Sequence, residues 1–201
     1  MNIIRINKDA VRPAANIFTQ AFKQEPIFKY IFGNEKKYSQ AAPWLFASWV
    51  KWAVRFGEAW MSDDGNAAVI MRRMENSEMS FSSMVKAGML PTPLKLGLPA
   101  FRRFYFTVLP ILEKKHKEIM GNTPHWYGWM IGSTTQGKGM GRPLLEHVKA
   151  IADDKGLPIF LETATESNLA LYHKLGFEVK DQQIVNGECT IYFLVRQPVS
   201  K

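Results

Sequence analysis

The sequence predicts an α/β domain in which helices cover both faces of a mixed sheet. Apolar residues recur at steps of three and four along several segments, and short apolar runs lie between them, which indicates helices alternating with buried strands. The turns Asp63-Asp64-Gly65-Asn66 and Asn186-Gly187 are typical of tight hairpins. The resulting order is β-α-α-β-β, an irregular insert, and then β-α-β-α-β-β. This order predicts one domain over residues 1–201.

The N-terminal half begins with a strand and continues with helices. Asp9 stands where a helix cap is expected, and apolar residues follow at helical spacing from Val11 to Phe22. The elements expected here are a strand at 3–7, helices at 11–22, 28–33 and 38–56, and strands at 58–62 and 67–71.

Residues 74–122 are expected to form a helical insert before the fourth strand, and prolines interrupt its pattern. Its helical stretches are predicted at 77–87 and 99–119, and the insert is a candidate lid over an acceptor site. The elements predicted after it are a strand at 126–131, a helix at 139–154, a strand at 158–161, a helix at 167–175, and strands at 177–183 and 189–196.

Composition excludes several classes of protein. The single cysteine, Cys189, cannot form an internal disulfide, and the four histidines show no zinc-ligand spacing, so we expect no metal. The most apolar stretch, 44–60, contains three charged residues, so we expect no membrane span and a cytoplasmic location. A net charge of +8 fits a phosphorylated partner or an ordinary lysine-rich surface. Because no long basic run is present, nucleic acid is not expected.

The most informative segment is Gln136-Gly137-Lys138-Gly139-Met140-Gly141-Arg142, between a buried strand and a helix. Three glycines at alternate positions let the main chain approach a ligand without interference from a Cβ atom. The first amides of the following helix have no partners within the helix, and with the helix dipole they form an anion site suited to a pyrophosphate. Lys138 and Arg142 add positive charge at its rim.

Other glycine loops fit this segment less well. A Walker A loop needs Ser or Thr after Gly-Lys, and here Gly139 follows Lys138. A Rossmann loop is supported by Glu162 at the end of the next strand, where a ribose-binding acid is expected, but the glycine spacing is G-x-G-x-G. A surface loop that binds nothing also stays open.

The segment matches the signature Q/R-x-x-G-x-G/A of the GNAT superfamily, and the sequence resembles that superfamily from His125 to Phe177. On the next helix Asn168 and Tyr172 precede Gly176-Phe177, as in many members. Together with Leu161-Glu162-Thr163, this part of the chain is similar to the puromycin N-acetyltransferase group. The resemblance implies a mostly antiparallel, twisted sheet of about seven strands, with the acetyl-CoA-binding core at residues 125–177.

The resemblance also implies roles for individual residues. Main-chain groups around Ile131, Gly132 and Ser133 would pair with the pantetheine arm of acetyl-CoA, and the amides of residues 137–142 would bind its pyrophosphate. Asn168 would hydrogen-bond the same arm. Between Gly132 and Gln136 the chain is two residues shorter than in most members, so the register of the preceding strand stays open.

For Tyr172, the resemblance implies a hydroxyl that protonates the departing thiolate; the alternative is an aromatic ring that only packs between helix and sheet. An amine acceptor must lose a proton before it attacks, and the base is Glu162, His125 or a chain of water molecules. Glu162 could instead be a cap or an ion-pair partner, and His125 an ordinary strand residue.

The sequence favours an N-acetyltransferase that acts on a small primary amine, as a monomer or homodimer. An apolar acceptor pocket was expected from aromatic and methionine residues of the N-terminal helices and the insert: Phe22, Phe28, Tyr30, Phe32, Trp49, Met84, Met89, Phe101 and Phe104. The alternatives are an NAD-type dinucleotide-dependent oxidoreductase and a CoA-binding module without catalysis.

Overall fold

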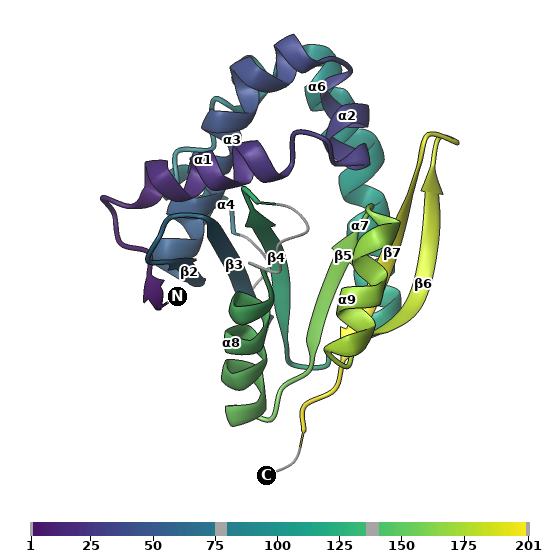
Figure 1. The fold of residues 1–201 in the computed structure, drawn as a ribbon. Helices are drawn as coiled ribbons and strands as arrows, with labels where there is room; N and C mark the ends of the chain where they lie inside the picture. Colours follow the sequence, from purple (N-terminus) through teal and green to yellow (C-terminus); the bar gives the residue numbers. More distant parts are fainter. Residues whose placement is uncertain (1, 75–79, 136–140, 200–201) are drawn as a thin grey trace.

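The computed structural model describes residues 2–74, 80–135 and 141–199, and these form a seven-stranded sheet in the order β1-β2-β3-β4-β5-β7-β6 (Figure 1). The strands are β1 (Ile3–Arg5), β2 (Glu58–Ser62), β3 (Ala67–Met74), β4 (His125–Ser133), β5 (Ile159–Thr163), β6 (Glu178–Val185) and β7 (Cys189–Arg196). Only the β4–β5 pair is parallel. The predicted mixed, mostly antiparallel sheet of about seven strands is confirmed.

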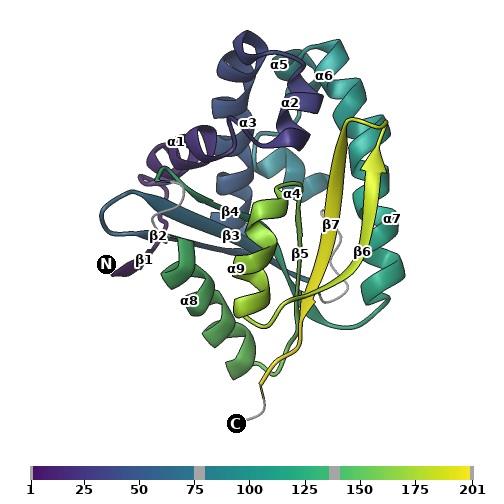
Figure 2. The ribbon, with the colours of Figure 1, turned by 45° about the vertical axis from the view of Figure 1, so that its right-hand side comes forward.

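Helices lie on both faces of this sheet, as predicted (Figures 1 and 2). They are α1 (Val11–Ala21), α2 (Pro26–Phe32), α3 (Glu35–Phe56), α4 (Phe81–Lys86), α5 (Thr92–Leu96), α6 (Leu98–Arg103), the π-helical turn η1 (Phe104–Val108), α7 (Leu109–Met120), α8 (Gly141–Asp154), the 3₁₀ turn η2 (Glu166–Asn168) and α9 (Leu169–Lys174). One hydrophobic core packs α1, α3 and α7 on one face, around Phe46 and Phe160. The other packs α8 and α9 on the opposite face, around Leu144 and Phe177.

The start of α1 differs in detail from the prediction. Ala10, rather than Asp9, is the N-cap residue, and its side chain makes no capping bond. The Asn7 side chain orders the turn before the helix: its Oδ1 accepts hydrogen bonds from the main-chain N–H groups of Asp9 and Ala10, both at 3.0 Å. Residue Asp9 is therefore a donor in the turn and not its cap.

The insert is more helical than the sequence pattern indicated. Its second stretch, α6 through η1 to α7, runs from Leu98 to Met120, close to the predicted 99–119. The short helix α5 was not predicted, because Pro91 and Pro93 were interpreted as interruptions. Pro93 instead occupies the first turn of α5, where its missing N–H costs no helical bond, and Gly97 with φ of 75° ends the helix.

Both predicted hairpin turns are present. In the β2–β3 turn, Ser62 Oγ accepts hydrogen bonds from the N–H groups of Asn66 and Ala67, at 3.1 and 3.0 Å. In the β6–β7 turn, Asn186 and Gly187 have φ of 47° and 73°. Two consecutive residues at positive φ are typical of a type I′ turn, whose twist matches the strands that it joins.

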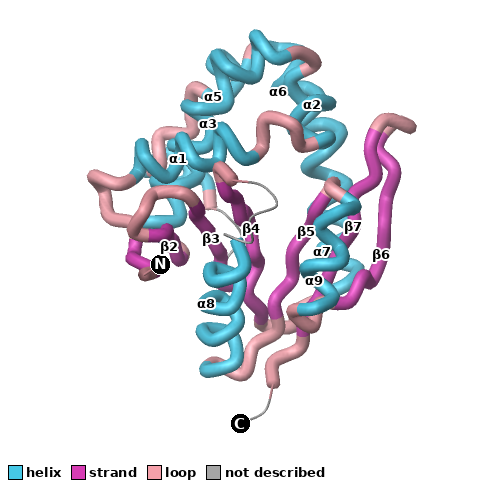
Figure 3. Tube along the Cα trace, viewed as in Figure 1, coloured by secondary structure: helices cyan, strands magenta, loops and turns pink. Residues whose placement is uncertain are grey.

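The middle of β4 carries a β-bulge. Gly128 faces Met71 on β3, and Met130 faces the preceding residue Ile70, so Trp129 is an extra residue on β4. Beyond the bulge β4 leaves its parallel neighbour: the pairing with β5 ends at Gly128 and Leu161, and the two strands diverge (Figure 3).

None of the described helices has the length and apolar content needed to span a bilayer.

Candidate functional site

The separation of β4 and β5 leaves part of a strand edge unpaired in the middle of the sheet. Residues Ile131, Gly132 and Ser133 pair with β3 on one side, opposite Val69, Ala68 and Ala67. On the other side no described residue of β5 faces them. Main-chain groups on that side can therefore bind an extended ligand as another strand would, which is the position that the sequence predicted for an arm of the cofactor.

Gly132 has a packing role that the sequence did not reveal. A Cβ atom built on it would lie 2.9 Å from the Cβ of Ala21 and 3.2 Å from Cδ1 of Phe18. Both contacts come from α1, which packs directly on this part of β4. The glycine therefore allows the close approach of α1 to the strand.

Five residues of the predicted pyrophosphate loop, Gln136, Gly137, Lys138, Gly139 and Met140, lie outside the described part of the chain. The description resumes at Gly141 and Arg142, which begin α8, so the predicted helix after the loop is confirmed from residue 141 onward.

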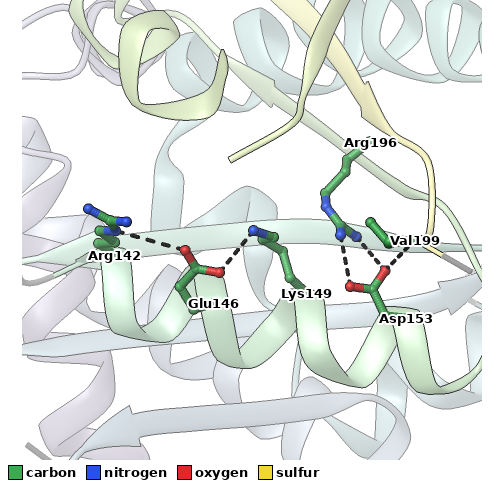
Figure 4. Close-up of polar contacts among 6 residues, drawn as sticks. All are labelled: Arg142, Glu146, Lys149, Asp153, Arg196 and Val199. Atoms are coloured by element: carbon green, nitrogen blue, oxygen red, sulfur yellow. Dashed lines mark hydrogen bonds and ion pairs between the residues drawn. The ribbon is translucent and has the colours of Figure 1, made fainter. Parts of the chain in front are cut away.

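At the start of α8, the described part of the chain leaves space beside Gly141. A Cβ atom built on Gly141 would meet no described atom within 4 Å. Arg142 is exposed, and its Nε lies 3.8 Å from Glu146 Oε1, whose other oxygen is 2.9 Å from Lys149 Nζ (Figure 4). The first amides of α8 have no partner within the helix itself, and Arg142 beside them is a cation in a weak ion pair with Glu146.

Tyr172 is buried in α9, with 8% of its surface exposed. Its ring packs against Phe177 at a centroid distance of 5.6 Å. Burial, and then the negative charge of Glu25, raise the pKa of the Tyr172 hydroxyl far above its ordinary value, so the hydroxyl keeps its proton at neutral pH. Asn168 is the last residue of η2, half-buried, and lies one turn before Tyr172 in continuous helical backbone.

Glu25 belongs to this site, although the sequence did not single it out. It precedes α2, and its carboxylate accepts a hydrogen bond from the N–H of Ala164 at 3.2 Å and another from the hydroxyl of Thr165. These partners follow β5 directly, so Glu25 connects the N-terminal helices to the end of the central strand. Burial raises the pKa of the Glu25 carboxyl, while the two hydrogen bonds oppose that shift. Only the pair Glu25-Pro26 signals a helix start locally, and its partners lie about 140 residues away.

Glu162 follows Leu161, the last residue of β5 that pairs with β4, and it still pairs with Phe193 of β7 on the other side. It accepts a hydrogen bond from the Tyr127 hydroxyl. Burial raises the pKa of Glu162 to about 7, against the opposing effects of that hydrogen bond and of the Arg72 charge. Arg72 lies 4.6 Å from the ring centroid of Tyr127 and 5.0 Å from that of Trp129. A carboxyl group with a pKa near 7 can both accept and release a proton at neutral pH.

His125, the other base considered, lies at the beginning of β4, at the opposite end from the diverging segment. Its Nδ1 donates to the Thr123 carbonyl at 2.6 Å, and its Nε2 accepts from His116 Nε2 at 2.7 Å. Burial lowers the pKa of both histidines, that of His116 to about 4. Both ring nitrogens of His125 are engaged within the fold, so the structure does not bring this residue to the site.

The aromatic residues expected to line an acceptor pocket mostly pack against one another. Phe22, Phe28, Trp49 and Phe104 form a chain of ring contacts with centroid distances between 5.4 and 6.5 Å. All nine residues of the predicted set belong to, or pack against, the core on the α1–α3 face. They serve first as core residues, and an apolar acceptor pocket stays a prediction.

Comparison with known proteins agrees with this architecture. Residues 105–177 match the model of the acetyltransferase (GNAT) family. The chain is 26% identical over 204 aligned residues to the uncharacterized N-acetyltransferase C550.08 of Schizosaccharomyces pombe, covering 96% of this chain and 82% of the relative.

Solved acetyltransferase structures share the fold. A histone acetyltransferase HPA2 and related acetyltransferase from Corynebacterium glutamicum superposes with a TM-score of 0.71 at 17% identity, covering 100% of this chain and 97% of the other. Arylalkylamine N-acetyltransferase 2 from Aedes aegypti gives 0.69 at 14% identity, with 98% of each chain covered. The polyamine N-acetyltransferase of Drosophila melanogaster gives 0.67 at 12% identity, covering 98% and 99%.

The resemblance to the puromycin N-acetyltransferase group stays a prediction. The matched segment contains β4, the predicted loop, β5 and Tyr172, and the fold agrees over the whole chain. The chain is thus similar to the GNAT family over residues 105–177, and over its whole length it has the fold of solved acetyltransferases.

Proposed function

We propose that this protein is an acetyl-CoA-dependent N-acetyltransferase that transfers the acetyl group directly to a primary amine of a small acceptor. The observation that carries the proposal is the divergence of β4 from β5 after Gly128 and Leu161. The divergence opens a strand edge in the middle of the sheet. Glu25 bonds to residues that directly follow β5, and Tyr172 packs in one core with Leu161 of β5.

The residues at this opening fit the cofactor that the fold family uses. Main-chain groups of residues 131–133 would bind its extended amide-bearing arm, with Asn168 from the neighbouring helix. Amides of residues 137–142 would bind its diphosphate, and the space beside Gly141 supports this placement, because a ligand can reach the helix start there. When bound, acetyl-CoA supplies an acetyl group activated as a thioester.

Proton transfer in this proposal uses groups that the fold buries. Tyr172 holds its proton at neutral pH, so its hydroxyl can protonate a departing thiolate. Two carboxylates can accept the proton of the incoming ammonium group: Glu25, whose charge acts on Tyr172, and Glu162, whose pKa is near 7. The pH–rate profiles of Glu25→Gln and Glu162→Gln would identify which of them acts, because loss of the base removes the acidic limb of the profile.

The names of two similar structures support an amine as the acceptor, since one is an arylalkylamine and the other a polyamine N-acetyltransferase. We extend that acceptor class to this chain as part of the proposal, together with a cytoplasmic location and a monomeric or homodimeric state.

The test is release of free CoA, followed with a thiol-reactive dye, when the protein is mixed with acetyl-CoA and each member of a panel of primary amines. Amine-dependent thiol release, with the acetylated amine identified by mass spectrometry, is the expected result. Binding of acetyl-CoA without transfer to any amine would favour a CoA-binding module. Binding of NAD in place of acetyl-CoA would favour the dinucleotide-dependent oxidoreductase.

A further inference from the structure

A pocket of about 360 Å³ lies outside the site described above, between α2, α6 and the turn that joins β6 to β7. Its lining residues are Pro26, Lys29, Tyr30, Gly33, Arg103 and Glu188. A second pocket, of about 230 Å³, shares Gly33 and Arg103 with the first and adds Lys37. The two pockets therefore adjoin each other at Gly33 and Arg103, and we refer to their lining together as the surface around Arg103.

Positive charge dominates this surface. Lys29, Lys37 and Arg103 line it against one carboxylate, that of Glu188. None of the three cations forms an ion pair with a residue that the structure describes. Unpaired cations that converge on a concave surface attract anions more strongly than the same charges spread over a convex one.

Arg103 is held in place by the fold. Its Nη1 donates a hydrogen bond to the carbonyl of Ile31, at 3.4 Å, in the last turn of α2. Gly33, with φ of 75°, makes room for it, because a Cβ atom there would lie 2.6 Å from the same Nη1. A guanidinium has five N–H donors, and this contact uses one of them. The remaining planar fork suits a carboxylate or a phosphate group.

The pocket adjoins the transfer site. Pro26 in its wall follows Glu25, which bonds to residues at the end of β5. Because Pro26 directly follows Glu25 in the chain, this part of the pocket lining lies close to Glu25.

A hydrogen bond keeps the two walls together. Asn186 Nδ2 in the β6–β7 turn donates to the Tyr30 hydroxyl on α2, at 2.7 Å. The shape of the pocket is thus set by contacts between elements and does not rest on exposed side chains alone.

We propose that this pocket binds an anionic group, a carboxylate or a phosphate, at the far end of the acceptor amine. The inference rests on the proposed function and deepens it: the acceptor is an amine whose other end is negatively charged. The amine end lies toward Glu25, and the anionic end lies among Lys29, Lys37 and Arg103.

The experiment compares acceptors of equal length that differ only at the far end: 5-aminopentanoate, its neutral amide, and an aminoalkyl phosphate. We expect kcat/KM to be about five- to tenfold higher for an anionic acceptor than for the amide, since the cations are partly exposed and screened. The anionic acceptor with the higher kcat/KM, carboxylate or phosphate, identifies the preferred anion.

The variants Lys29→Met and Lys37→Met keep the apolar stem and remove the charge. Each should lower the ratio of kcat/KM between the anionic acceptor and the amide by about threefold. Lys51→Met, an exposed change on α3 outside both pockets, is the matched control and should leave the ratio unchanged.

Calorimetric titration of the same compounds onto the protein without acetyl-CoA separates this inference from the proposed function. Binding of the anionic amine that weakens in Lys29→Met and Lys37→Met supports the pocket even if no acetylation occurs. Acetylation of the amide as fast as of the anionic amines, or a ratio that both variants leave unchanged, overturns the inference and leaves the acetyltransferase proposal intact. Absence of binding together with absence of acetylation overturns both.

Discussion

At the scale of single residues, the proposed site contains two groups whose pKa values the fold has changed, Tyr172 and Glu162. Tyr172 keeps its proton because it is buried beside the negative charge of Glu25. Burial raises the pKa of the Glu162 carboxyl to about 7, although the hydrogen bond from Tyr127 acts in the opposite direction. Acidic and basic groups with pKa values moved in this way are common where protons are transferred.

Removal of the Tyr172 hydroxyl tests its role as an acid. Tyr172→Phe keeps the ring that packs on Phe177, so the fold should persist. We expect kcat to fall at least about tenfold, while the dissociation constant for acetyl-CoA changes little, since loss of a general acid slows only the chemical step. Steady-state kinetics and calorimetric titration measure the two quantities. Unchanged turnover would leave Tyr172 as a packing residue.

Glu162 makes the stability of the fold depend on pH. Its folded pKa, about 7, is above the ordinary value of 4.5, so the folded state binds the proton more tightly than the unfolded state does. The stabilisation that this difference provides is complete below about pH 4.5 and is lost as pH rises through 7. Relative to Glu162→Gln, the wild type should therefore lose up to about 3 kcal/mol of unfolding free energy over that window.

Denaturant titrations at half-unit steps of pH measure the difference between the two proteins, which removes the contributions of other titrating groups such as His116. Parallel curves for wild type and Glu162→Gln would show that the carboxyl titrates normally in the folded state.

At the scale of elements, α8 begins directly after the predicted cofactor loop and contacts the C-terminal strand β7 at its other end. Its last turn carries Asp153, which accepts two hydrogen bonds from Arg196 of β7, both at 2.8 Å, and a third from the N–H of Val199 at 2.9 Å (Figure 4). The side chain of Arg196 is 4% exposed and that of Asp153 is 23% exposed. The Arg196 hydrogen bonds are the largest cause of a lowered pKa of the Asp153 carboxyl.

Breaking this pair should destabilise the chain strongly, because a buried guanidinium would lose its partner. We expect Asp153→Ala to lower the unfolding free energy by about 3 kcal/mol. Asp154→Ala is the control from the next position, where an exposed carboxylate lies 3.8 Å from Lys155 Nζ, and it should cost no more than about 0.5 kcal/mol. Chemical denaturation measures both, and equal losses would contradict the assigned role of the buried pair.

A substitution in the first turn of α8 can separate an effect on stability from an effect on acetyl-CoA binding. Gly141→Ala adds a methyl group where no described atom lies within 4 Å, and alanine is the better helix former, so stability should stay equal or rise slightly. If the diphosphate lies against this turn, the same methyl group should weaken acetyl-CoA binding by about tenfold or more.

Calorimetric titration and thermal unfolding read out the two effects separately. Ala150→Ser, an exposed change further along the same helix, is the control and should leave affinity unchanged. An unaltered affinity in Gly141→Ala would place the diphosphate elsewhere.

At the scale of the whole molecule, two hydrophobic cores support one sheet whose central strands diverge. The α1–α3 face brings Glu25 to the residues that follow β5, and on the α8–α9 face Tyr172 packs in one core with Leu161 of β5. Helices α8 and α9 lie together on that face (Figure 1). A ligand that enters this opening contacts elements from both faces. Its binding should therefore stabilise the entire fold and not a single segment.

Acetyl-CoA at about one hundred times its dissociation constant should raise the midpoint of thermal unfolding by about 5 to 10 °C. NAD at the same concentration serves as the matched control and should produce no shift, since the predicted glycine segment lacks the dinucleotide spacing. Differential scanning fluorimetry is sufficient for both measurements. A shift with NAD alone would contradict the acetyltransferase assignment.

The sequence by itself was enough to predict the strands, most helices and both hairpins. Each of these elements depends on residues that are close together in the sequence. Examples are the apolar spacing from Val11 to Phe22 for α1, the glycine after Asn186 for the β6–β7 turn, and the proline that follows α8 for the end of that helix. It also predicted the helix α8 and singled out Tyr172 as a candidate, because both motifs are contiguous in the sequence. Two local predictions were wrong: Ala10 and not Asp9 is the N-cap residue of α1, and α5 forms around a proline that was interpreted as an interruption.

Only the tertiary structure decided which of these residues share a site. The bond from Thr165 to Glu25, the divergence of β4 from β5 and the pocket around Arg103 join segments far apart in sequence. The pKa of Glu162 likewise depends on its desolvation and on Tyr127 and Arg72, two groups from neighbouring strands. No local pattern encodes such relations, because burial and charge pairing act through space and are set once the two faces of the sheet have packed.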